Sequence, residues 1–175
     1  VTPTPEPEPA DGELVLVRDY IPGIFIDLKY ATTDNFTGRV IYDSDEAYLR
    51  YGTVKKLLCA QNELSGRGLS LKIWDAYRPV SAQFKLWEIC PNPVYDPNNG
   101  YSKHSRANTV DITLVTDTGK SIPMPSGFDD FTSLADRDYS DVSAEAAENA
   151  RLLENVMVEN GFVPYSGEWW HYSDS

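Results

Sequence analysis

Alternating apolar and polar residues along the chain predict β-strands. In a strand every second side chain lies on the same face, so one face can pack on a core while the other stays polar. Residues 69–75 (LSLKIWD) and 109–115 (TVDITLV) follow this pattern, and shorter apolar runs precede them. A Ser–Gly pair between two aromatic-rich runs predicts a closing hairpin. The predicted strands are residues 14–18, 24–28, 69–75 and 109–115, with 162–165 and 169–173 forming the hairpin.

Apolar residues spaced three or four apart predict helices. Glycines follow the first of these segments, prolines flank the second, and Ser143 is the expected N-cap of the third. Helices and strands interleave along the chain, and several connections between strands are short. We therefore expect a single α+β domain with a mainly antiparallel central sheet flanked by helices. The predicted helices are residues 45–64, 80–89 and 144–160.

The first thirteen residues, VTPTPEPEPADGE, differ from the rest of the chain. Proline alternating with Thr and Glu neither forms a helix nor buries apolar surface, so we expect residues 1–13 to be a disordered, extended tail before a folded domain over 14–175. Such a stalk is common behind a removed signal peptide or lipid anchor. We therefore expect an extracytoplasmic protein, secreted or tethered to the cell envelope; a cytoplasmic location is the alternative.

Charge and cysteine usage exclude several classes of function. The chain has 27 acidic and 15 basic residues, a net charge of −12, which argues against binding to nucleic acid or to anionic lipid. No apolar run is long enough for a membrane span. Cys59 and Cys90 form no CxxC or Cys/His cluster, so a cysteine zinc site is not expected. Either they form a disulfide, as in an oxidising compartment, or they are two buried free thiols.

The two histidines of the chain are candidate metal ligands. His104 lies seven residues before Asp111, where a loop enters a predicted strand. That spacing alone favours a loop histidine and a surface aspartate over a metal site. Neutral imidazole and carboxylate are also zinc ligands, and a catalytic zinc takes three protein ligands and keeps one position open. Only His171 remains to complete such a set, so we hypothesise a Zn²⁺ site of His104, Asp111 and His171.

Glu168, three residues before His171, is the predicted general base for the attacking water. Residues i and i+3 of a regular strand point to opposite faces, so a flat strand would not bring both side chains to one metal. We therefore expect Glu168 in the bend after residues 166–167, with the strand beginning after it. Trp169 and Trp170 are expected to fix these side chains by packing; the alternative is that EWWHY is aromatic core only.

Arg78 stands between the end of a predicted strand and a helix-starting proline, in WDAYRP (74–79). Strand ends are frequent positions for functional side chains. A guanidinium there could bind a substrate carboxylate or stabilise the oxyanion of a tetrahedral intermediate. The alternative is a surface ion pair with Asp75.

Five stretches together resemble the zinc D-alanyl-D-alanine dipeptidases of the VanX type, within a broader zinc D,D-peptidase family that includes D,D-carboxypeptidases. They occur in family order and span nearly everything after the tail. The resemblance implies the hedgehog-like zinc D,D-peptidase fold, a catalytic domain over residues 14–175, one Zn²⁺ per chain and a small D,D-peptide substrate. The stretches are DLKYATTDNFTG (27–38), WDAYRP (74–79), SKHSRANTVDITL (102–114), IPMPSGFDDF (122–131) and NGFVPYSGEWWHY (160–172).

The resemblance also implies roles for individual residues. His104, Asp111 and His171 match the zinc ligands of the family, Glu168 its general base and Arg78 its transition-state arginine. Three further positions match the pocket that the dipeptidase branch builds for the free ammonium group of the substrate, and a buried ammonium needs a paired charge. These positions are Tyr30, Ser102 and Asp129.

The zinc motif departs from the family pattern S-x-H-x-x-G-x-A-x-D at two positions. Ala107 replaces the glycine and Thr109 replaces the alanine, while the ligand spacing is kept. The loop is expected to need a backbone conformation that alanine tolerates less well than glycine.

The implied function is hydrolysis of D-Ala-D-Ala in peptidoglycan metabolism or glycopeptide resistance. A D,D-carboxypeptidase acting on stem peptides is the first alternative, and a non-catalytic zinc or cell-wall-binding module is the second. Retention of Glu168 and Arg78 disfavours the second, because a binding site needs no base beside its metal.

Overall fold

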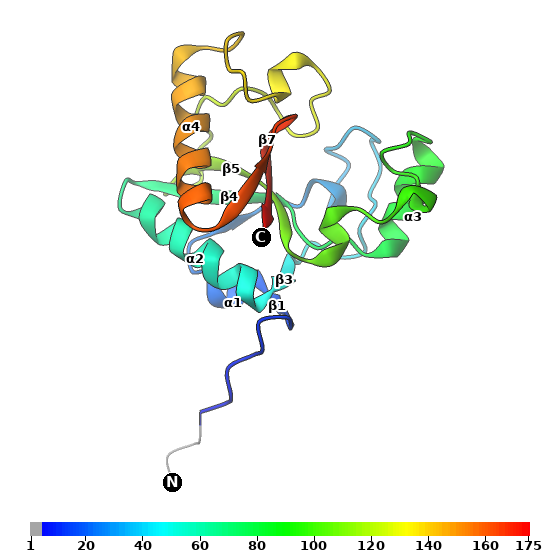
Figure 1. Ribbon diagram of the computed structural model, residues 1–175, viewed down its shortest axis with the longest axis horizontal. Helices are drawn as coiled ribbons and strands as arrows, with labels where there is room; N and C mark the ends of the chain where they lie inside the picture. The colour runs from blue at the N-terminus through cyan, green and yellow to red at the C-terminus, as the bar shows by residue number, and fades with distance from the viewer. Residues whose placement is uncertain (1–4) are drawn as a thin grey trace.

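A five-stranded mixed sheet forms the centre of the protein (Figure 1). The structure is a computed structural model that describes residues 5–175, so the first part of the tail predicted over residues 1–13 lies outside the described residues. Only the pair β2–β4 is parallel, and the other neighbours are antiparallel, which confirms the predicted mainly antiparallel α+β sheet. In spatial order the strands are β2 (Phe25–Ile26), β4 (Leu69–Asp75), β5 (Thr109–Thr116), β7 (Glu168–Asp174) and β6 (Phe162–Tyr165).

All three predicted helices form, although the one predicted over residues 45–64 begins later than expected. Ser143 caps α4 through a hydrogen bond that its Oγ accepts from the Ala146 amide at 3.2 Å, as predicted. No helix of the described residues is long and apolar enough to cross a membrane. The helices are α1 (Val17–Tyr20), α2 (Tyr51–Ser65), α3 (Val80–Ile89) and α4 (Ala144–Glu159), with 3₁₀ turns η1 (Lys29–Ala31), η2 (Pro97–Asn99), η3 (Lys103–Arg106) and η4 (Ser133–Ala135).

The helix predicted over residues 45–64 begins only at Tyr51. The preceding residues form β3 (Tyr48–Arg50), which pairs antiparallel with β1 (Leu14–Leu16) in a separate two-stranded sheet. The strand predicted over 14–18 ends early for the same reason, because α1 starts where this pairing stops. Local periodicity could not reveal a pairing between segments more than thirty residues apart.

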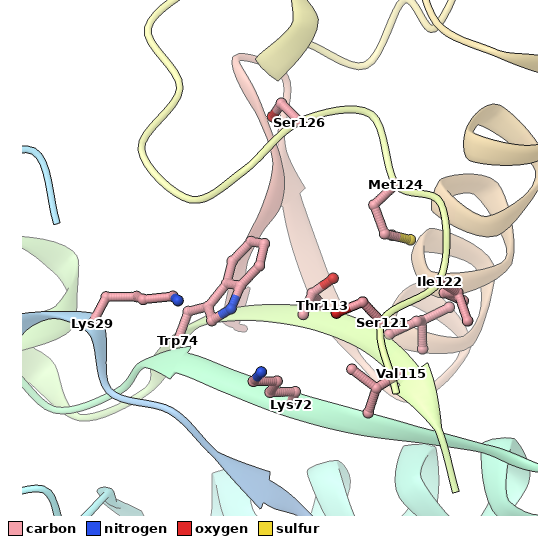
Figure 2. A pocket seen from close by; sticks show the side chains of 10 residues that line it. Lys29, Lys72, Trp74, Thr113, Val115, Ser121, Ile122, Met124 and Ser126 are labelled. Carbon is pink, nitrogen blue, oxygen red and sulfur yellow. The ribbon is translucent and has the colours of Figure 1, made fainter. Parts of the chain in front are cut away.

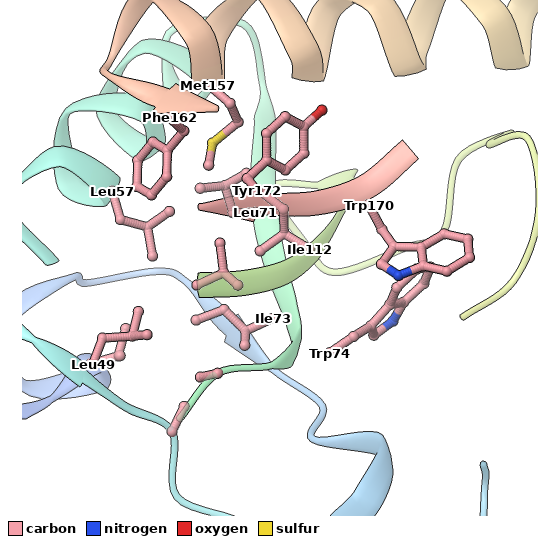
Figure 3. Packing of buried hydrophobic residues seen from close by; sticks show 14 of the residues in the cluster. Leu49, Leu57, Leu71, Ile73, Trp74, Ile112, Met157, Phe162, Trp170 and Tyr172 are labelled. Atoms are coloured by element: carbon pink, nitrogen blue, oxygen red, sulfur yellow. The ribbon is translucent and has the colours of Figure 1, made fainter. Parts of the chain in front are cut away.

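One face of the central sheet packs against α2 and α4 (Figure 1). The core on that face combines side chains of both helices with the apolar face of the strands, and each fully buried large side chain contributes roughly 1.5–3 kcal/mol. Trp74 and Trp170 lie close together at one end of this cluster (Figure 3). Its members include Leu57, Leu71, Ile112, Met157, Phe162 and Tyr172, each at most 2% exposed.

The other face of β5 is polar in sequence but is also buried. Thr109, Asp111 and Thr113 are at most 5% exposed, so the interpretation of Asp111 as a surface aspartate is wrong. The long loop between β5 and α4 covers this face, where Phe128 packs against Trp74 with ring centroids 5.7 Å apart. A buried carboxylate needs charged or hydrogen-bonding partners, and the position of Asp111 therefore marks a site rather than a surface.

Arg137 attaches this same loop to the β6–β7 hairpin. Its Nε donates to the carbonyl of Tyr165 at 2.7 Å, and its Nη2 donates to the carbonyl of His171 at 3.0 Å. Its Nη1 reaches the carboxylate of Glu154 at 3.2 Å and the hydroxyl of Tyr172 at 3.1 Å. One side chain thus joins the loop, helix α4 and both strands of the hairpin.

The two cysteines are free thiols, so the disulfide alternative is wrong. Cys59 is exposed on α2 and Cys90 is half-buried at the end of α3, so the expectation of two buried thiols is also wrong.

Candidate active site

Three side chains from separate segments converge on the buried face of β5. Asp111 lies directly across from His171 in the β5–β7 register, and His104 comes from η3. His104 Nε2 lies 3.2 Å from Asp111 Oδ2, and His171 Nδ1 lies 2.9 Å from Asp111 Oδ1. One ligand atom from each residue lies within 4.8 Å of the other two, so the three side chains form a compact metal-binding group.

The ring of His104 is oriented by the backbone. Its Nδ1 lies 3.0 Å from the carbonyl oxygen of Ala76. In the tautomer that carries its proton on Nδ1, the ring donates to this carbonyl and the lone pair of Nε2 stays free. Metal-ligating histidines commonly hold their second nitrogen in this way. The histidine therefore presents Nε2 to the space beside Asp111.

Glu168 lies on the same side of β7 as His171, with its Oε2 3.4 Å from His171 Nδ1. Glu168 is the first residue of β7, so the expectation that the strand begins after it is wrong. The register with β6 shifts instead: Pro164 pairs with Tyr172 and the next residue, Tyr165, pairs with Glu168. Three residues of β7 have no partner on β6, and strict alternation is broken there.

The two tryptophans within this irregular segment are both buried, although neighbours in a regular strand would face opposite sides. Trp169 and Trp170 are 0% and 1% exposed, and their rings meet Trp74 with centroids 5.5 Å and 6.5 Å away. The Nε1 of Trp169 donates to Ser126 Oγ at 2.8 Å. Packing of these rings keeps Glu168 and His171 on the site side.

Burial and neighbouring charges shift the pKa values of two carboxyl groups in the site in opposite directions. Burial opposes ionisation of Asp111, but the contacts with His104 and His171 hold its pKa well below the usual range. Burial raises the pKa of Glu168 to about 8, with the negative charges of Asp111 and Asp129 adding to the effect. Burial also opposes protonation of His104, yet Asp111 and Asp75 raise its pKa to about 9.

Arg78 is fixed in a buried ion pair with Asp75. Its Nη2 lies 2.7 Å from Asp75 Oδ2, and the two side chains are 7% and 0% exposed. The pairing is the one proposed from sequence, but its interpretation as a surface pair is wrong. Nη1 of the same guanidinium reaches Gln83 Oε1 at 3.3 Å and Ser102 Oγ at 3.5 Å. The arginine is therefore held rigidly beside η3.

Sequence reasoning missed two residues that position this arginine. These residues are Tyr42 and Gln83. The hydroxyl of Tyr42 donates a hydrogen bond to Asp75, the ion-pair partner of the arginine. Gln83 is 1% exposed and donates to the carbonyl of Tyr95 at 3.0 Å. Gln83 carries a detectable signal, because it stands three residues before Leu86 on the apolar side of a predicted helix. A polar residue in such a stripe needs a buried partner.

The residues implied to bind an ammonium group form a connected set around Arg78. The hydroxyl of Tyr30 donates to Asp129, and the guanidinium of Arg78 lies 5.2 Å from the centroid of the Tyr30 ring. Ser102 Oγ lies 3.5 Å from Nη1 of the same guanidinium. Burial raises the pKa of Asp129 to about 7, the hydrogen bond from Tyr30 acting against that rise. Asp129 itself has a left-handed backbone with φ of +53°.

A cavity of about 450 Å³ opens onto Glu168 and His171. Its walls come from the loop after α3, from η3 and from the loop before η4. Tyr95 and Lys103 line it from the first two, and Phe131 lines it from the third. The site is thus open to a small ligand on the side of Glu168 and His171.

Ala107 ends η3 in the left-handed conformation, with φ of +59° and ψ of +24°. Its amide donates to the carbonyl of His104 at 3.1 Å, so this turn directly follows a metal-group residue. The expectation that this position needs a backbone suited to glycine is confirmed, since alanine is disfavoured there by roughly 1–2 kcal/mol.

A histidine–aspartate–histidine group with an adjacent carboxylate and a buried arginine, open to a small cavity, defines a metallopeptidase. Comparison with known families agrees. The sequence model of the peptidase M15 family, described as D-Ala-D-Ala dipeptidase, matches residues 10–175, and the chain belongs to this family.

Curated relatives carry the same description. The chain is similar to a D-alanyl-D-alanine dipeptidase of Escherichia coli, 38% identical over 91% of this chain and 83% of the relative. It is also similar to those of Enterococcus faecium, 35% identical over 88% and 87%, and of Streptomyces coelicolor, 36% identical over 93% and 91%.

Proposed function

We propose that this protein is a zinc-dependent dipeptidase that hydrolyses D-Ala-D-Ala. The observation that carries the proposal is the convergence of His104, Asp111 and His171 beside Glu168. Relatives named D-alanyl-D-alanine dipeptidase, which this chain matches over most of its length, support the substrate.

The donor set fits zinc. Two imidazole nitrogens and one carboxylate are ligands that zinc accepts, and three protein ligands leave the open position of a catalytic site. The hydrogen bond from His104 to the Ala76 carbonyl provides the expected support behind a ligand. When bound, zinc would supply a Lewis acid and lower the pKa of a water molecule towards about 7.

Glu168 takes the role of general base. Its carboxylate lies at the edge of the metal-binding group and lines the cavity, so it can accept a proton from the attacking water. A carboxyl group whose pKa stands above its usual value returns that proton readily, here to the nitrogen of the departing amino acid. A cation bound next to Glu168 would favour its charged form and set it to act as the base first.

Arg78 stabilises the negative charge that develops on the carbonyl oxygen. The buried pair with Asp75 and the contact with Gln83 hold the guanidinium in place before the substrate arrives. Such preorganised donors act strongly in a site from which water is excluded.

Asp129 and Tyr30 bind the free ammonium group of the dipeptide. The carboxylate of Asp129 supplies the paired charge, and the hydrogen bond from Tyr30 orients it. A substrate without a free amino group would leave this carboxylate buried and unpaired, which disfavours N-blocked peptides.

An activity assay with two substrates tests the proposal. Zinc-loaded protein is incubated with D-Ala-D-Ala or with an N-acylated peptide ending in D-Ala-D-Ala, and released D-alanine is measured. We expect hydrolysis of the free dipeptide only, loss of activity with a chelator and recovery with zinc. An intact dipeptide would contradict the proposal, and cleavage of the acylated peptide alone would favour the D,D-carboxypeptidase alternative.

A further inference from the structure

A second cavity, of about 290 Å³, lies under the loop that follows β5 (Figure 2). Its floor is the polar face of β4 and β5, and its roof is the segment from Ser121 to Ser126. None of the residues assigned above to the metal, the base or the substrate lines it. Any ligand of this cavity therefore requires its own explanation.

Two ammonium groups face the cavity and share one partly buried carboxylate. Asp27 Oδ2 lies 3.0 Å from Lys29 Nζ and 3.4 Å from Lys72 Nζ. Lys29 has a second partner, Asp34 at 2.7 Å, but that carboxylate is 80% exposed and its charge is well screened. The lysine side chains are only 16% and 26% exposed. The two ammonium groups meet two carboxylates, but neither carboxylate lines the cavity, so the charged groups that line it are the two lysines.

Neutral donors point into the same space. Lys72 pairs directly with Thr113 across the β4–β5 register, and Trp74 lies where that register is interrupted. Figure 2 shows the Trp74 indole and the Thr113 hydroxyl beside the Lys72 ammonium group. Trp74 and Thr113 are 9% and 5% exposed, and within residues 5–175 neither the indole N–H nor the hydroxyl has a hydrogen-bond partner in the protein, although neither atom is fully buried. Both groups line the cavity and are free to donate a hydrogen bond to a ligand in it.

We propose that this cavity binds a small oxyanion, the carboxylate of an amino-acid-sized molecule or a phosphate group. Its lining includes two lysines, an indole N–H and hydroxyl groups, and no carboxylate. The arrangement stands out in a protein with a net charge of −12, in which anions are repelled from most of the surface. Charge-assisted hydrogen bonds from Lys72, Trp74 and Thr113 would complete the coordination of the anion.

The site is separate from the catalytic group but adjoins it. The ring of Trp74 packs against Trp169 with centroids 5.5 Å apart. The indole N–H of Trp169 in turn donates a hydrogen bond to Ser126 Oγ in the cavity roof. The Trp74 indole N–H is therefore a local reporter of occupancy, independent of catalysis.

Nuclear magnetic resonance of the indole N–H groups tests the proposal on the zinc-loaded protein. Sodium acetate, D-alanine and inorganic phosphate are titrated at constant ionic strength, with chloride as the reference anion. The Trp74 signal, assigned from its absence in Trp74→Phe, is expected to shift saturably with at least one oxyanion and not with chloride. A response to acetate and D-alanine identifies a carboxylate ligand, and a response to phosphate alone identifies a phosphate ligand.

Matched variants test whether the response comes from this cavity. Lys72→Gln and Thr113→Val should each weaken binding at least fivefold, whereas Lys72→Arg, which keeps the charge, should retain it. Lys55→Gln is the control, because it also removes one lysine and one ion pair. Lys55 lies on helix α2, away from the cavity lining, and its Nζ lies 2.6 Å from Asp11 Oδ1. Absence of a saturable shift, or equal affinity in Lys72→Gln and Lys55→Gln, would overturn the proposal.

Discussion

The proposed metal-binding half of the active site and its proposed substrate-binding half are built in different ways. Asp111 and His171 are mounted opposite each other on hydrogen-bonded strands, and His104 is anchored to a backbone carbonyl. Tyr30 and Asp129, by contrast, come from a 3₁₀ turn and a loop, and meet through a side-chain hydrogen bond. Strand pairing and a backbone anchor position the first half, whereas the second half depends on a side-chain contact between two segments outside the sheet.

This difference separates two tasks. A sheet-mounted group keeps its geometry without substrate, as catalysis requires. A loop-mounted pocket can change between family members without disturbing the sheet, so selection of the substrate can vary while the chemistry stays constant. Changes in the first half should therefore lower kcat, and changes in the second should mainly raise KM.

The largest expected effect is that of Glu168→Gln, which replaces the carboxylate of the proposed base by an amide of nearly the same shape. We expect kcat to fall by roughly 10²–10⁴, with zinc content unchanged, because Glu168 moves a proton rather than holding the metal. Metal analysis and D-alanine release measure the two quantities. Glu145→Gln, at an exposed position in the first turn of α4, is the matched control. Loss of zinc in Glu168→Gln would make Glu168 a ligand instead.

Arg78→Lys keeps the charge but removes the planar guanidinium. We expect kcat to fall by roughly 10²–10³ with a small change in KM, because a lysine cannot contact Asp75, Gln83 and the substrate oxygen together. Steady-state kinetics on D-Ala-D-Ala measures this split. If KM rises while kcat stays constant, Arg78 binds the ground state and not the developing charge.

Asp129→Asn tests the substrate half. We expect kcat/KM for the free dipeptide to fall by roughly 10–100-fold, mainly through KM, since the ammonium group loses a charged partner. Asp43→Asn is the control, because Asp43 is another loop aspartate whose side chain is 91% exposed. An unchanged KM would remove Asp129 from the ammonium pocket.

The same variant should change the pH dependence of stability in the metal-free protein. The pKa of Asp129 is about 7 in the folded protein and 3.8 in its ordinary state, so between these values the folded state binds more protons than the unfolded state. The contribution of Asp129 to folding stability therefore decreases as pH rises from about 4 to about 7. Denaturant unfolding across this range should show a smaller decrease for Asp129→Asn, and parallel curves would contradict the burial of this charge.

The smallest effect is expected from Ala107→Gly. Glycine relieves the left-handed strain but gains entropy in the unfolded chain, so we expect a net stabilisation of about 1 kcal/mol or less. That corresponds to a rise in Tm of roughly 2–4 °C, measurable by calorimetry. Ala147→Gly, equally buried but helical, should destabilise the protein instead. Destabilisation by both variants would show that the methyl group of Ala107 matters more than its backbone.

The sequence predicts the metal-binding half better than the substrate-binding half. Two histidines and the alternation of β5 were enough to propose His104, Asp111 and His171 together. Tyr30 and Asp129 could be proposed only from a family resemblance, because they are 99 positions apart and lie in loops without periodicity.

Two features could not be predicted because they depend on distant partners. The break in alternation that aligns Glu168 with His171 arises from the register with β6, which the residues of β7 do not encode by themselves. The burial of Asp75 arises from Tyr42, 33 positions earlier, which covers it only in the folded protein. Local patterns gave the strands, and tertiary packing decided which acidic residues are buried.

The four contacts of Arg137 have a consequence for local opening of the protein. Amide hydrogen exchange occurs through cooperative units that open together. Arg137 lies in the loop between β5 and α4 and donates hydrogen bonds to the carbonyls of Tyr165 on β6 and His171 on β7. This loop therefore cannot detach without breaking its hydrogen bonds to both strands of the hairpin. The loop between β5 and α4 and the β6–β7 hairpin should therefore exchange as one unit, and His171, a proposed metal ligand, is released only when that whole unit opens.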